Sequence, residues 1–340
     1  MYMYMYIQTS LFLYFFSRSW LTIWVVSSFL HLHCSGNRLI NTKNSSQVRL
    51  AQCTRWDELK ETVNYHAQLS ALVQAPTTFR LLNNPGMHVG SQEFSVADKG
   101  YDKQTIEKDV ENAKRIMGNA SPSGVTPLAR HVREIRDSIL PMADDLHNQG
   151  KKVTVVLATD GLPTNERGVG GLDERNDFTE ALRSMEGLPV WIVIRLCTDE
   201  DDVVEYYNDI DTQLELSIEV LDDFIGEAKE VYEHNSWLTY TLPMHRMREM
   251  GIPHRLFDLL DERPFTRSEL RDFCFLLFGQ GAFDGVPEPE EDFPEFIKAL
   301  DAILKREKDQ WDPVKKKMKP LLHLKEMNRI YGNSSSCTIM

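Results

Sequence analysis

Apolar residues recur with two different patterns along the middle of the chain. In four stretches they return every three or four positions, which is the period of a helix with one buried face. Two short, mainly apolar runs without alternation stand apart from these stretches, at residues 153–158 and 188–196. Runs of this kind are typical of strands that are buried on both faces of a parallel sheet. The four helical stretches are residues 54–74, 103–117, 127–148 and 177–185.

The alternation of helical stretches and buried runs predicts an α/β fold. We expect a doubly wound, mostly parallel sheet flanked by helices, as in Rossmann-like domains. Shorter strands are expected at residues 77–82 and 215–220, and a closing helix at residues 222–232. The α/β domain is therefore predicted over residues 51–235.

The pattern changes after residue 235 to short helices without intervening strands. Thr266 and Glu269 have the spacing of a capping box, and an apolar helical stretch follows them. Three or four helices of this size can form a small bundle. The sequence thus predicts a small helical unit over residues 243–325, followed by a flexible tail over residues 326–340.

Residues 1–50 form an apolar, low-complexity segment that begins with a three-fold Met-Tyr repeat. The apolar run over residues 7–32 contains Arg18 near its middle. Three interpretations remain open. The run is a signal peptide or membrane anchor that lacks a basic start, or it holds the first strand of the sheet within residues 21–32. The third interpretation is a gene-model artefact, in which non-coding sequence replaces the true first exon.

The charge balance argues against a nucleic-acid partner. The chain carries 51 acidic and 38 basic residues, for a net charge of −13, whereas nucleic-acid binding requires a basic face. Residues 199–230 alone contain thirteen acidic side chains and one basic one, and we interpret them as solvated helix faces. The five cysteines are widely separated, and no pair has metal-ligand spacing. This usage is typical of a reducing, cytoplasmic compartment.

A candidate ligand site lies where the first buried run ends. Asp160 follows this run, on a turn made by Gly161 and Pro163. Thr126 opens the helical stretch that precedes the run, where it would serve as the helix N-cap. In a doubly wound sheet, ligands bind at the carboxyl ends of the strands. A hydroxyl and a carboxylate at this edge can supply part of a site for Mg²⁺ or Mn²⁺.

Residues from about 54 to about 230 resemble a von Willebrand factor A domain. The resemblance rests on the order and spacing of Thr126 and of the Thr159-Asp160-Gly161 triplet within the helix and strand pattern. In that family, a threonine that opens a middle helix and an aspartate after the fourth strand belong to a metal-ion-dependent adhesion site. The resemblance implies a doubly wound sheet, Thr126 and Asp160 as metal ligands, and a protein partner that offers a carboxylate to the metal.

The first metal loop of the family, Asp-x-Ser-x-Ser, is absent from the chain. The nearest approach is residues 33–37, His-Cys-Ser-Gly-Asn, after the N-terminal apolar run. Ser35 and Asn37 stand where the two serines would be, and they are the tentative further ligands. His33 takes the place of the carboxylate, and imidazole is a poor ligand for Mg²⁺. The metal site is therefore predicted to be degenerate or partial.

The last four residues, Cys337-Thr338-Ile339-Met340, fit the Cys-a-a-X pattern of a farnesylated cysteine. Basic residues outnumber acidic ones by nine to four over residues 305–329. A single lipid chain usually needs such a basic patch to hold a protein at a membrane surface. We therefore expect a cytoplasmic protein with membrane association through Cys337. The alternative is a membrane-anchored or secreted protein, through the N-terminal segment.

These patterns favour a non-catalytic protein–protein interaction module over an enzyme. The chain contains no P-loop pattern and no clustered histidines, and Asp160 has no obvious acid–base companion. His66 lies on the apolar side of its predicted helix and is interpreted as a core histidine. The alternative function is a metal-dependent enzyme, such as a hydrolase, or a subunit of a chelatase-like ATPase assembly.

Overall fold

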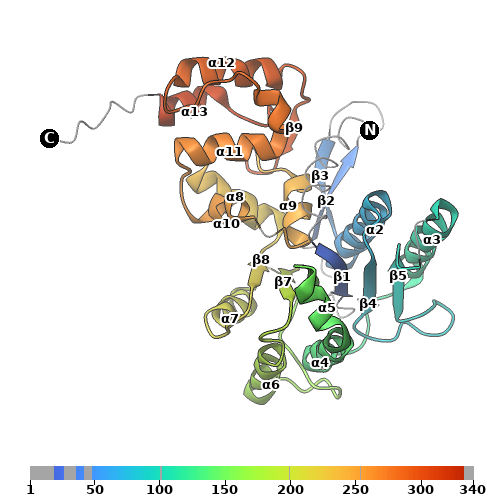
Figure 1. Ribbon diagram of the computed structural model, residues 1–340. Coiled ribbons are helices and arrows are strands. Elements are labelled where there is room, and N and C mark those ends of the chain that lie inside the picture. Colours follow the sequence, from blue (N-terminus) through green and yellow to red (C-terminus); the bar gives the residue numbers. More distant parts are fainter. Residues whose placement is uncertain are drawn as a thin grey trace.

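The computed structural model describes residues 19–26, 36–41, 48–99, 102–198, 200–252 and 254–332. Its centre is a six-stranded sheet with the strand order β5-β4-β1-β6-β7-β8 (Figure 1). Neighbouring strands of this sheet are parallel, except that β5 runs antiparallel to β4 at one edge. The strands are β1 (Ser19–Val26), β4 (Thr77–Leu81), β5 (Glu93–Val96), β6 (Lys152–Thr159), β7 (Val190–Leu196) and β8 (Ile218–Leu221).

The central strands are mainly apolar on both faces, as the apolar runs predict, although β6 and β7 also bury the polar side chains of Thr154 and Arg195. In β6, Val153, Val155 and Leu157 pack into a hydrophobic cluster on one face of the sheet. Val156 and Ala158 of the same strand pack into a second cluster on the opposite face. Successive side chains of a strand point to opposite faces, so a strand that is mainly apolar on both faces needs a cover on each side.

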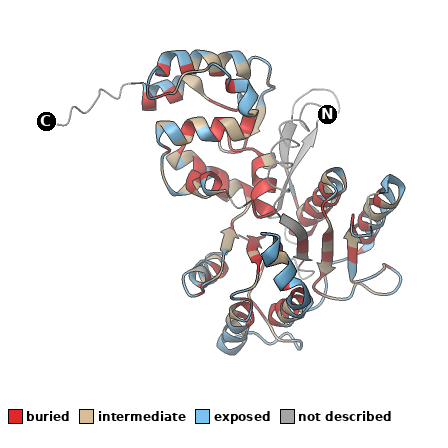
Figure 2. Ribbon diagram, viewed as in Figure 1, coloured by how far each residue is buried: buried red, intermediate tan, exposed pale blue. Residues whose placement is uncertain are grey.

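Helices supply that cover on both faces of the sheet. The cluster on one face includes α2 (Arg55–Val73) and α3 (Lys103–Asn119), together with α8 (Phe224–His234), which packs mainly against the helix over residues 255–262. The other face carries α4 (Leu128–Ile139), α6 (Leu172–Arg183) and α7 (Asp201–Asp211). Buried positions lie along the helix sides that face the sheet, and exposed positions lie on the outer sides (Figure 2). The predicted doubly wound, mostly parallel α/β fold is thereby confirmed.

The N-terminal segment contributes a central strand to this sheet. β1 lies between β4 and β6, and Val26 is in register with Leu81 on one side and with Ala158 on the other. Val25 and Val26 are completely buried, which explains why this part of the chain is so apolar. The α/β domain therefore begins well before residue 51, the predicted boundary, and the structure agrees with the first-strand interpretation for these residues. β2 (Gly36–Asn41) and β3 (Val48–Cys53) form a separate antiparallel hairpin.

The predicted helix over residues 127–148 is interrupted near its end. It divides into α4, the 3-10 helix η1 (Leu140–Met142) and α5 (Ala143–Asn148). The interruption contains Pro141. Proline has no backbone N–H and its ring clashes with the carbonyl one turn earlier, so an α-helix rarely continues through it unchanged.

The helical unit begins with α9 and extends further than predicted. The capping box of Thr266 and Glu269 is present at the start of α11. The last helix, α13, reaches Tyr331, where residues 326–340 were predicted to be a flexible tail, because Met327 and Tyr331 are buried in the core. The elements of the unit are α9 (Leu242–Glu249), α10 (Arg255–Glu262), α11 (Arg267–Phe278), η2 (Gln280–Phe283), α12 (Phe293–Leu304), β9 (Gln310–Asp312), β10 (Lys317–Lys319) and α13 (Leu324–Tyr331).

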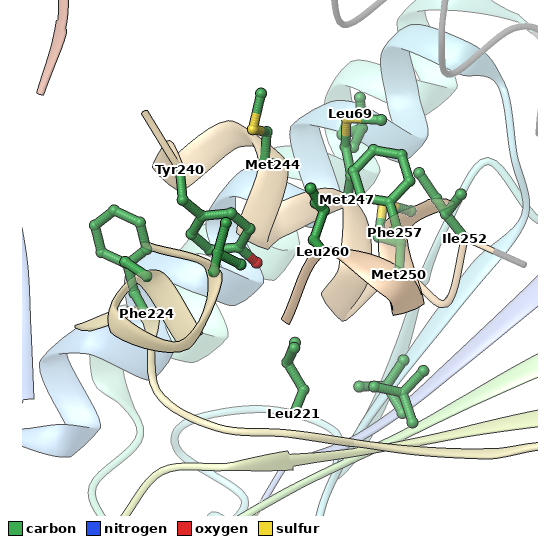
Figure 3. Close-up of a cluster of buried hydrophobic side chains, with 14 of the residues drawn as sticks. Leu69, Leu221, Phe224, Tyr240, Met244, Met247, Met250, Ile252, Phe257 and Leu260 are labelled. Atoms are coloured by element: carbon green, nitrogen blue, oxygen red, sulfur yellow. The ribbon is translucent and has the colours of Figure 1, made fainter. Parts of the chain in front are cut away.

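One hydrophobic core joins the helical unit to the sheet. Leu69 of α2, Leu221 of β8, Met247 of α9 and Phe257 of α10 belong to the same cluster (Figure 3). Gly251, just after α9, has a φ of +67°, and a Cβ there would come within 3.0 Å of Val193 in β7. The change of pattern after residue 235 thus marks a boundary in the sequence but not in the core.

Within the part of the chain that the structure describes, no helix is both long enough and apolar enough to cross a bilayer.

Candidate functional site

The carboxyl ends of the central strands meet at one edge of the sheet. Val26 at the end of β1 is in register with Ala158 of β6, and Thr159 is in register with Leu196 at the end of β7. Asp160 follows β6 directly and is 6% exposed. The structure therefore places this carboxylate at the edge where parallel sheets bind their ligands.

Thr126 is hydrogen-bonded to the loop that follows Asp160. Its backbone N–H donates to the Thr164 hydroxyl over 2.9 Å, and the Thr164 N–H donates back to the Thr126 carbonyl over 2.9 Å. Thr126 is 4% exposed. The structure thus brings the two residues singled out by the sequence to the same edge, through a threonine that the sequence analysis did not identify.

Asn83 ties a third loop to this edge. Its side-chain amide donates to the Val125 carbonyl over 2.7 Å, from the first turn after β4. Gly124 passes so close that a Cβ there would lie 2.4 Å from the Asn83 side chain, and its φ of +97° also favours glycine. The only sequence signal for Asn83 is its position just past a strand end.

The Thr126 hydroxyl does not cap α4, which differs from the expectation. The residue at the N-cap is Pro127, and no side chain caps this helix end. Among the described residues, the Thr126 hydroxyl makes no hydrogen bond, although the residue is almost fully buried. The oxygen itself is not one of the buried side-chain atoms that lack a partner among the described residues, so its position beside the Asp160 loop, and not an unmet hydrogen bond, makes it a candidate ligand.

Two oxygen donors of this kind fit a hard divalent cation. Mg²⁺ and Mn²⁺ prefer carboxylate, hydroxyl and water oxygens, and Asp160 and Thr126 offer one carboxylate and one hydroxyl. The turn that carries Asp160 is held by two hydroxyls, because Thr159 and Tyr207 both donate to the Gly161 carbonyl, over 3.1 Å and 2.9 Å. The turn that carries Asp160 is therefore held in place by two side-chain hydrogen bonds.

The tentative ligands lie elsewhere or outside the described residues. Asn37 lies in β2 and is paired with Gln52 of β3, in the hairpin rather than in the turn after β1. β1 is described up to Val26, and residues 27–35, which separate it from β2, lie outside the described residues. Ser35 and Cys337 both fall outside the described residues, and their proposed roles stay predictions.

Cys197, next to this edge, is not an activated nucleophile. Burial raises the pKa of its thiol to about 12, and the negative charges of Glu58 and Asp160 raise it further while Arg195 lowers it. The thiolate is the reactive form of cysteine, and at neutral pH this thiol stays protonated. Its position beside Asp160 therefore gives no support for catalysis.

A buried ionic network lies under α9, and the sequence analysis did not foresee it. We call its members the α9 seam: Glu58 and His66 of α2, Arg195 of β7, and His245, Arg246 and Glu249 of α9. Arg195 donates to Glu249 over 3.1 Å and also pairs with Glu58. Arg246 donates to Glu249 over 2.8 Å, and His66 lies 3.0 Å from the same carboxylate.

The α9 seam is a structural network and not a second site. Glu249, His66 and His245 are completely buried. Burial opposes the charge of Glu249, but Arg246, His66, His245 and Arg195 together hold its pKa well below the usual range. Burial lowers the pKa of His66, which agrees with its interpretation as a core histidine. The seam thus joins α2, the sheet and the helical unit through side chains that are mostly buried, with Glu58 the most exposed of the carboxylates at 15%.

Comparisons with known proteins do not assign this chain to a family. No protein-family model matches it, and no curated protein matches it. Among solved structures, it is similar to a mutant of the PilB minor pilin from Streptococcus sanguinis, with 11% sequence identity and a TM-score of 0.38. The match covers 60% of this chain and 57% of that chain. A likeness this weak carries no argument about function, which therefore rests on the site itself.

Proposed function

We propose that the protein is a non-catalytic protein–protein interaction module of the von Willebrand factor A type. Its binding surface is the carboxyl edge of the sheet, where Thr126, Asp160, Thr164 and Asn83 meet. The observation that carries the proposal is the position of Thr126 and Asp160 at one sheet edge, because the Thr126 backbone exchanges two hydrogen bonds with Thr164 in the loop that follows Asp160. Ligands of doubly wound sheets bind at this edge.

The bound group is a divalent cation, Mg²⁺ or Mn²⁺, in a partial site. Asp160 and Thr126 supply two of its oxygen ligands, and water and a carboxylate of the partner supply others. With few protein ligands, binding of the cation alone is weak. The acidic group of the partner therefore strengthens cation binding, and the cation strengthens partner binding by the same factor.

Exposed apolar side chains on the same loops support a protein partner. Met87, in the loop after β4, is fully exposed, and Val169 and Leu172 follow Asp160 and are more than half exposed. Gly168 holds this second loop against Val125, because a Cβ there would lie 2.8 Å from the valine side chain. Methionine is among the residues enriched at protein interfaces, and exposed apolar side chains that gather on one surface mark interaction sites.

The enzyme alternative has less support from the site. An acid–base or nucleophilic mechanism needs a titratable group beside Asp160 with a pKa near neutrality. Cys197 and Tyr207 lie close to it, but burial raises the pKa of the first to about 12 and that of the second well above its usual value. Both stay protonated, so neither activates water or a substrate at neutral pH.

Titration calorimetry of the full chain with Mg²⁺ and with Mn²⁺ tests the proposal. Wild-type protein is expected to give an isotherm in the micromolar-to-millimolar range, and Asp160→Asn and Thr126→Val are expected to lose it. Asp173→Asn, an exposed carboxylate in the first turn of α6, is the matched control and should bind as the wild type does. Equal isotherms for all four proteins, or none for the wild type, would contradict a cation at this edge.

A further inference from the structure

One buried arginine lies in the contact between the α/β domain and the helical unit. Arg248, at the end of α9, has a side chain that is only 5% exposed. Its Nε atom donates to Glu219 of the edge strand β8 over 3.0 Å. Its Nη1 atom donates to Asp261 of α10 over 2.8 Å and to Glu227 of α8, two helices that pack against each other beside the sheet (Figure 1). Arg248 therefore connects the helical unit to the last strand and the last helix of the α/β domain.

Carboxyl groups outnumber the positive charge at this contact. We call Arg248, Glu219, Glu227 and Asp261 the Arg248 cluster. Among the described residues, Arg248 is the only cation that forms an ion pair with these three acids. Oxygens of Glu227 and Asp261 also lie within 4.8 Å of each other. Three carboxyl groups from three different elements thus share one guanidinium.

This geometry favours a cluster that keeps a proton at neutral pH. The side chains of Glu219, Glu227 and Asp261 are 10%, 3% and 15% exposed, so solvent screens their mutual repulsion only weakly. Carboxyl groups that share a buried site do not all ionise, because each negative charge raises the cost of the next. One of the three acids is therefore expected to be neutral where an isolated carboxyl group would be charged.

The hydrogen bonds of Glu219 agree with a neutral group in the cluster. Its Oε1 atom accepts from Arg248, but its Oε2 atom is buried and has no partner among the described residues. A buried carboxylate needs partners for its oxygens, whereas a neutral carboxyl group in the same position costs less free energy. Incomplete pairing of Glu219 thus favours its protonated form.

The pKa values of the cluster shift in the direction that this geometry requires. Burial raises the pKa of Glu219 to about 7, with Asp258 and Asp261 adding to the effect and Arg248 opposing it. Burial also raises the pKa of Glu227 to about 8, against Arg248 and with Asp261. Because these groups interact, the protons belong to the cluster as a whole.

The other titratable groups that face the cluster do not add a positive charge at neutral pH. Burial keeps Tyr240 and His245 uncharged, because it raises the pKa of the tyrosine well above its usual value and lowers that of the histidine to about 3. The remaining groups are all acidic and increase the repulsion. They are Asp222 after β8, Glu230 and Glu233 of α8, and Asp258 and Glu262 of α10.

We propose that the Arg248 cluster is a pH-sensitive contact that holds the helical unit on the α/β domain. With its proton, the cluster keeps β8, α8 and α10 together around Arg248. Loss of the proton adds a buried negative charge, so the carboxylates repel one another and the contact weakens. The cluster contains none of the sheet-edge residues, so it acts whether or not that edge binds a cation.

The effect on stability has a definite sign. A glutamate of the unfolded chain has a pKa of about 4.3, so at neutral pH the folded chain keeps protons that the unfolded chain has lost. The stabilisation is full below the unfolded pKa and is lost as the pH rises through the folded values, about 7 for Glu219 and about 8 for Glu227. Buried histidines do not oppose this loss above about pH 6.5, because they are then neutral in both states.

Denaturant unfolding of the full chain at pH 6.5, 7.5 and 8.5 measures this loss. The unfolding equilibrium constant of the wild type is expected to increase at least about tenfold over this range. The double variant Glu219→Gln/Glu227→Gln has neutral amides in place of the two acids, so its constant should change less than about threefold. Glu227→Gln alone should be intermediate. Glu111→Gln/Glu205→Gln, which changes two exposed acids of α3 and α7, is the matched control and should behave as the wild type.

Hydrogen exchange shows where the contact weakens. After correction for the intrinsic effect of pH on exchange, raising the pH from 6.5 to 8.5 should accelerate exchange more in β8, α8 and α10 than in β6 and α4. The double variant should lose this difference. A wild-type stability that does not fall above pH 6.5, a double variant that falls as the wild type does, or equal acceleration in all elements would each overturn the proposal.

Discussion

The carboxyl edge of the sheet and the α9 seam both bury polar residues, but they hold them in different ways. In the α9 seam, the Glu249 carboxylate is contacted by Arg195, Arg246 and His66 at hydrogen-bond distance. At the sheet edge, Thr126 is nearly as buried and is held through its backbone, which exchanges two hydrogen bonds with Thr164. Burial alone therefore does not distinguish a structural polar residue from a candidate binding residue; the charged partners around its side chain do.

The largest expected effect is the loss of a charge from the α9 seam. Glu249→Ala leaves Arg195 and Arg246 buried without their shared carboxylate, and breaking a buried pair from one side costs about 3–5 kcal/mol. Denaturant unfolding should show this decrease in the free energy of unfolding. Glu180→Ala removes a surface partner of Arg183 and should cost less than about 1 kcal/mol. Equal costs for the two variants would mean that the seam does not stabilise the fold.

Acid should weaken the α9 seam through His245. Burial lowers the pKa of this histidine to about 3, with Arg195, Arg246 and Arg248 lowering it and Glu249 raising it. Between pH 6.5 and 3 the unfolded chain binds a proton that the folded chain does not, so stability is full above pH 6.5 and falls as the pH decreases. The slope per histidine is about 1.4 kcal/mol per pH unit.

Unfolding measured at pH 7, 6 and 5 tests this slope above the range where most carboxylates titrate. His245→Gln should flatten it, and His147→Gln should not, because His147 lies exposed near the end of α5. Because the buried Glu219 and Glu227, with pKa values raised to about 7 and about 8, change stability in the opposite direction over this range, the comparison between variants is decisive: equal slopes for wild type and His245→Gln would contradict a neutral, buried His245.

The smallest effect on stability is expected at the sheet edge. Thr126→Val removes a hydroxyl without a recorded partner, so the free energy of unfolding should change by less than about 1 kcal/mol, or increase. Thr62→Val is the matched variant in contact with the α9 seam, because the Thr62 hydroxyl accepts from Arg246 and donates to the Glu58 carbonyl. It should cost about 1–3 kcal/mol. If Thr126→Val is as costly as Thr62→Val, the edge hydroxyl is structural and the contrast disappears.

Local pattern was sufficient for the elements whose signals are contained in a few neighbouring residues. The mainly apolar run that became β6, the stripe that became α4 and the capping box of Thr266 and Glu269 each depend on residues within one or two turns. The same holds for Thr126 and Asp160 as edge residues, because the α/β alternation places a strand end and a helix start at the same side of the sheet.

Local sequence patterns could not predict the ion pairs between residues that are far apart in the sequence. Arg195 and Glu249 are 54 residues apart, and His66 and Glu249 are 183 residues apart. Nothing in the neighbourhood of a charged residue says whether it is solvated or meets an opposite charge from a distant element. For this reason, the acidic side chains of residues 199–230 are interpreted from the sequence as solvated helix faces, whereas the structure buries Glu227 and pairs it with Arg248.

The chain's periodicity therefore accounts for the α/β class, the order of most elements and the positions of Thr126 and Asp160, since these follow from backbone geometry and local burial. Tertiary structure decided that β1 fills the centre of the sheet, that the helical unit shares its core, and which polar groups find partners. Those outcomes depend on contacts between segments that are distant in the sequence. Such contacts stabilise the protein only after the chain between the segments has been ordered, so local patterns do not reveal them.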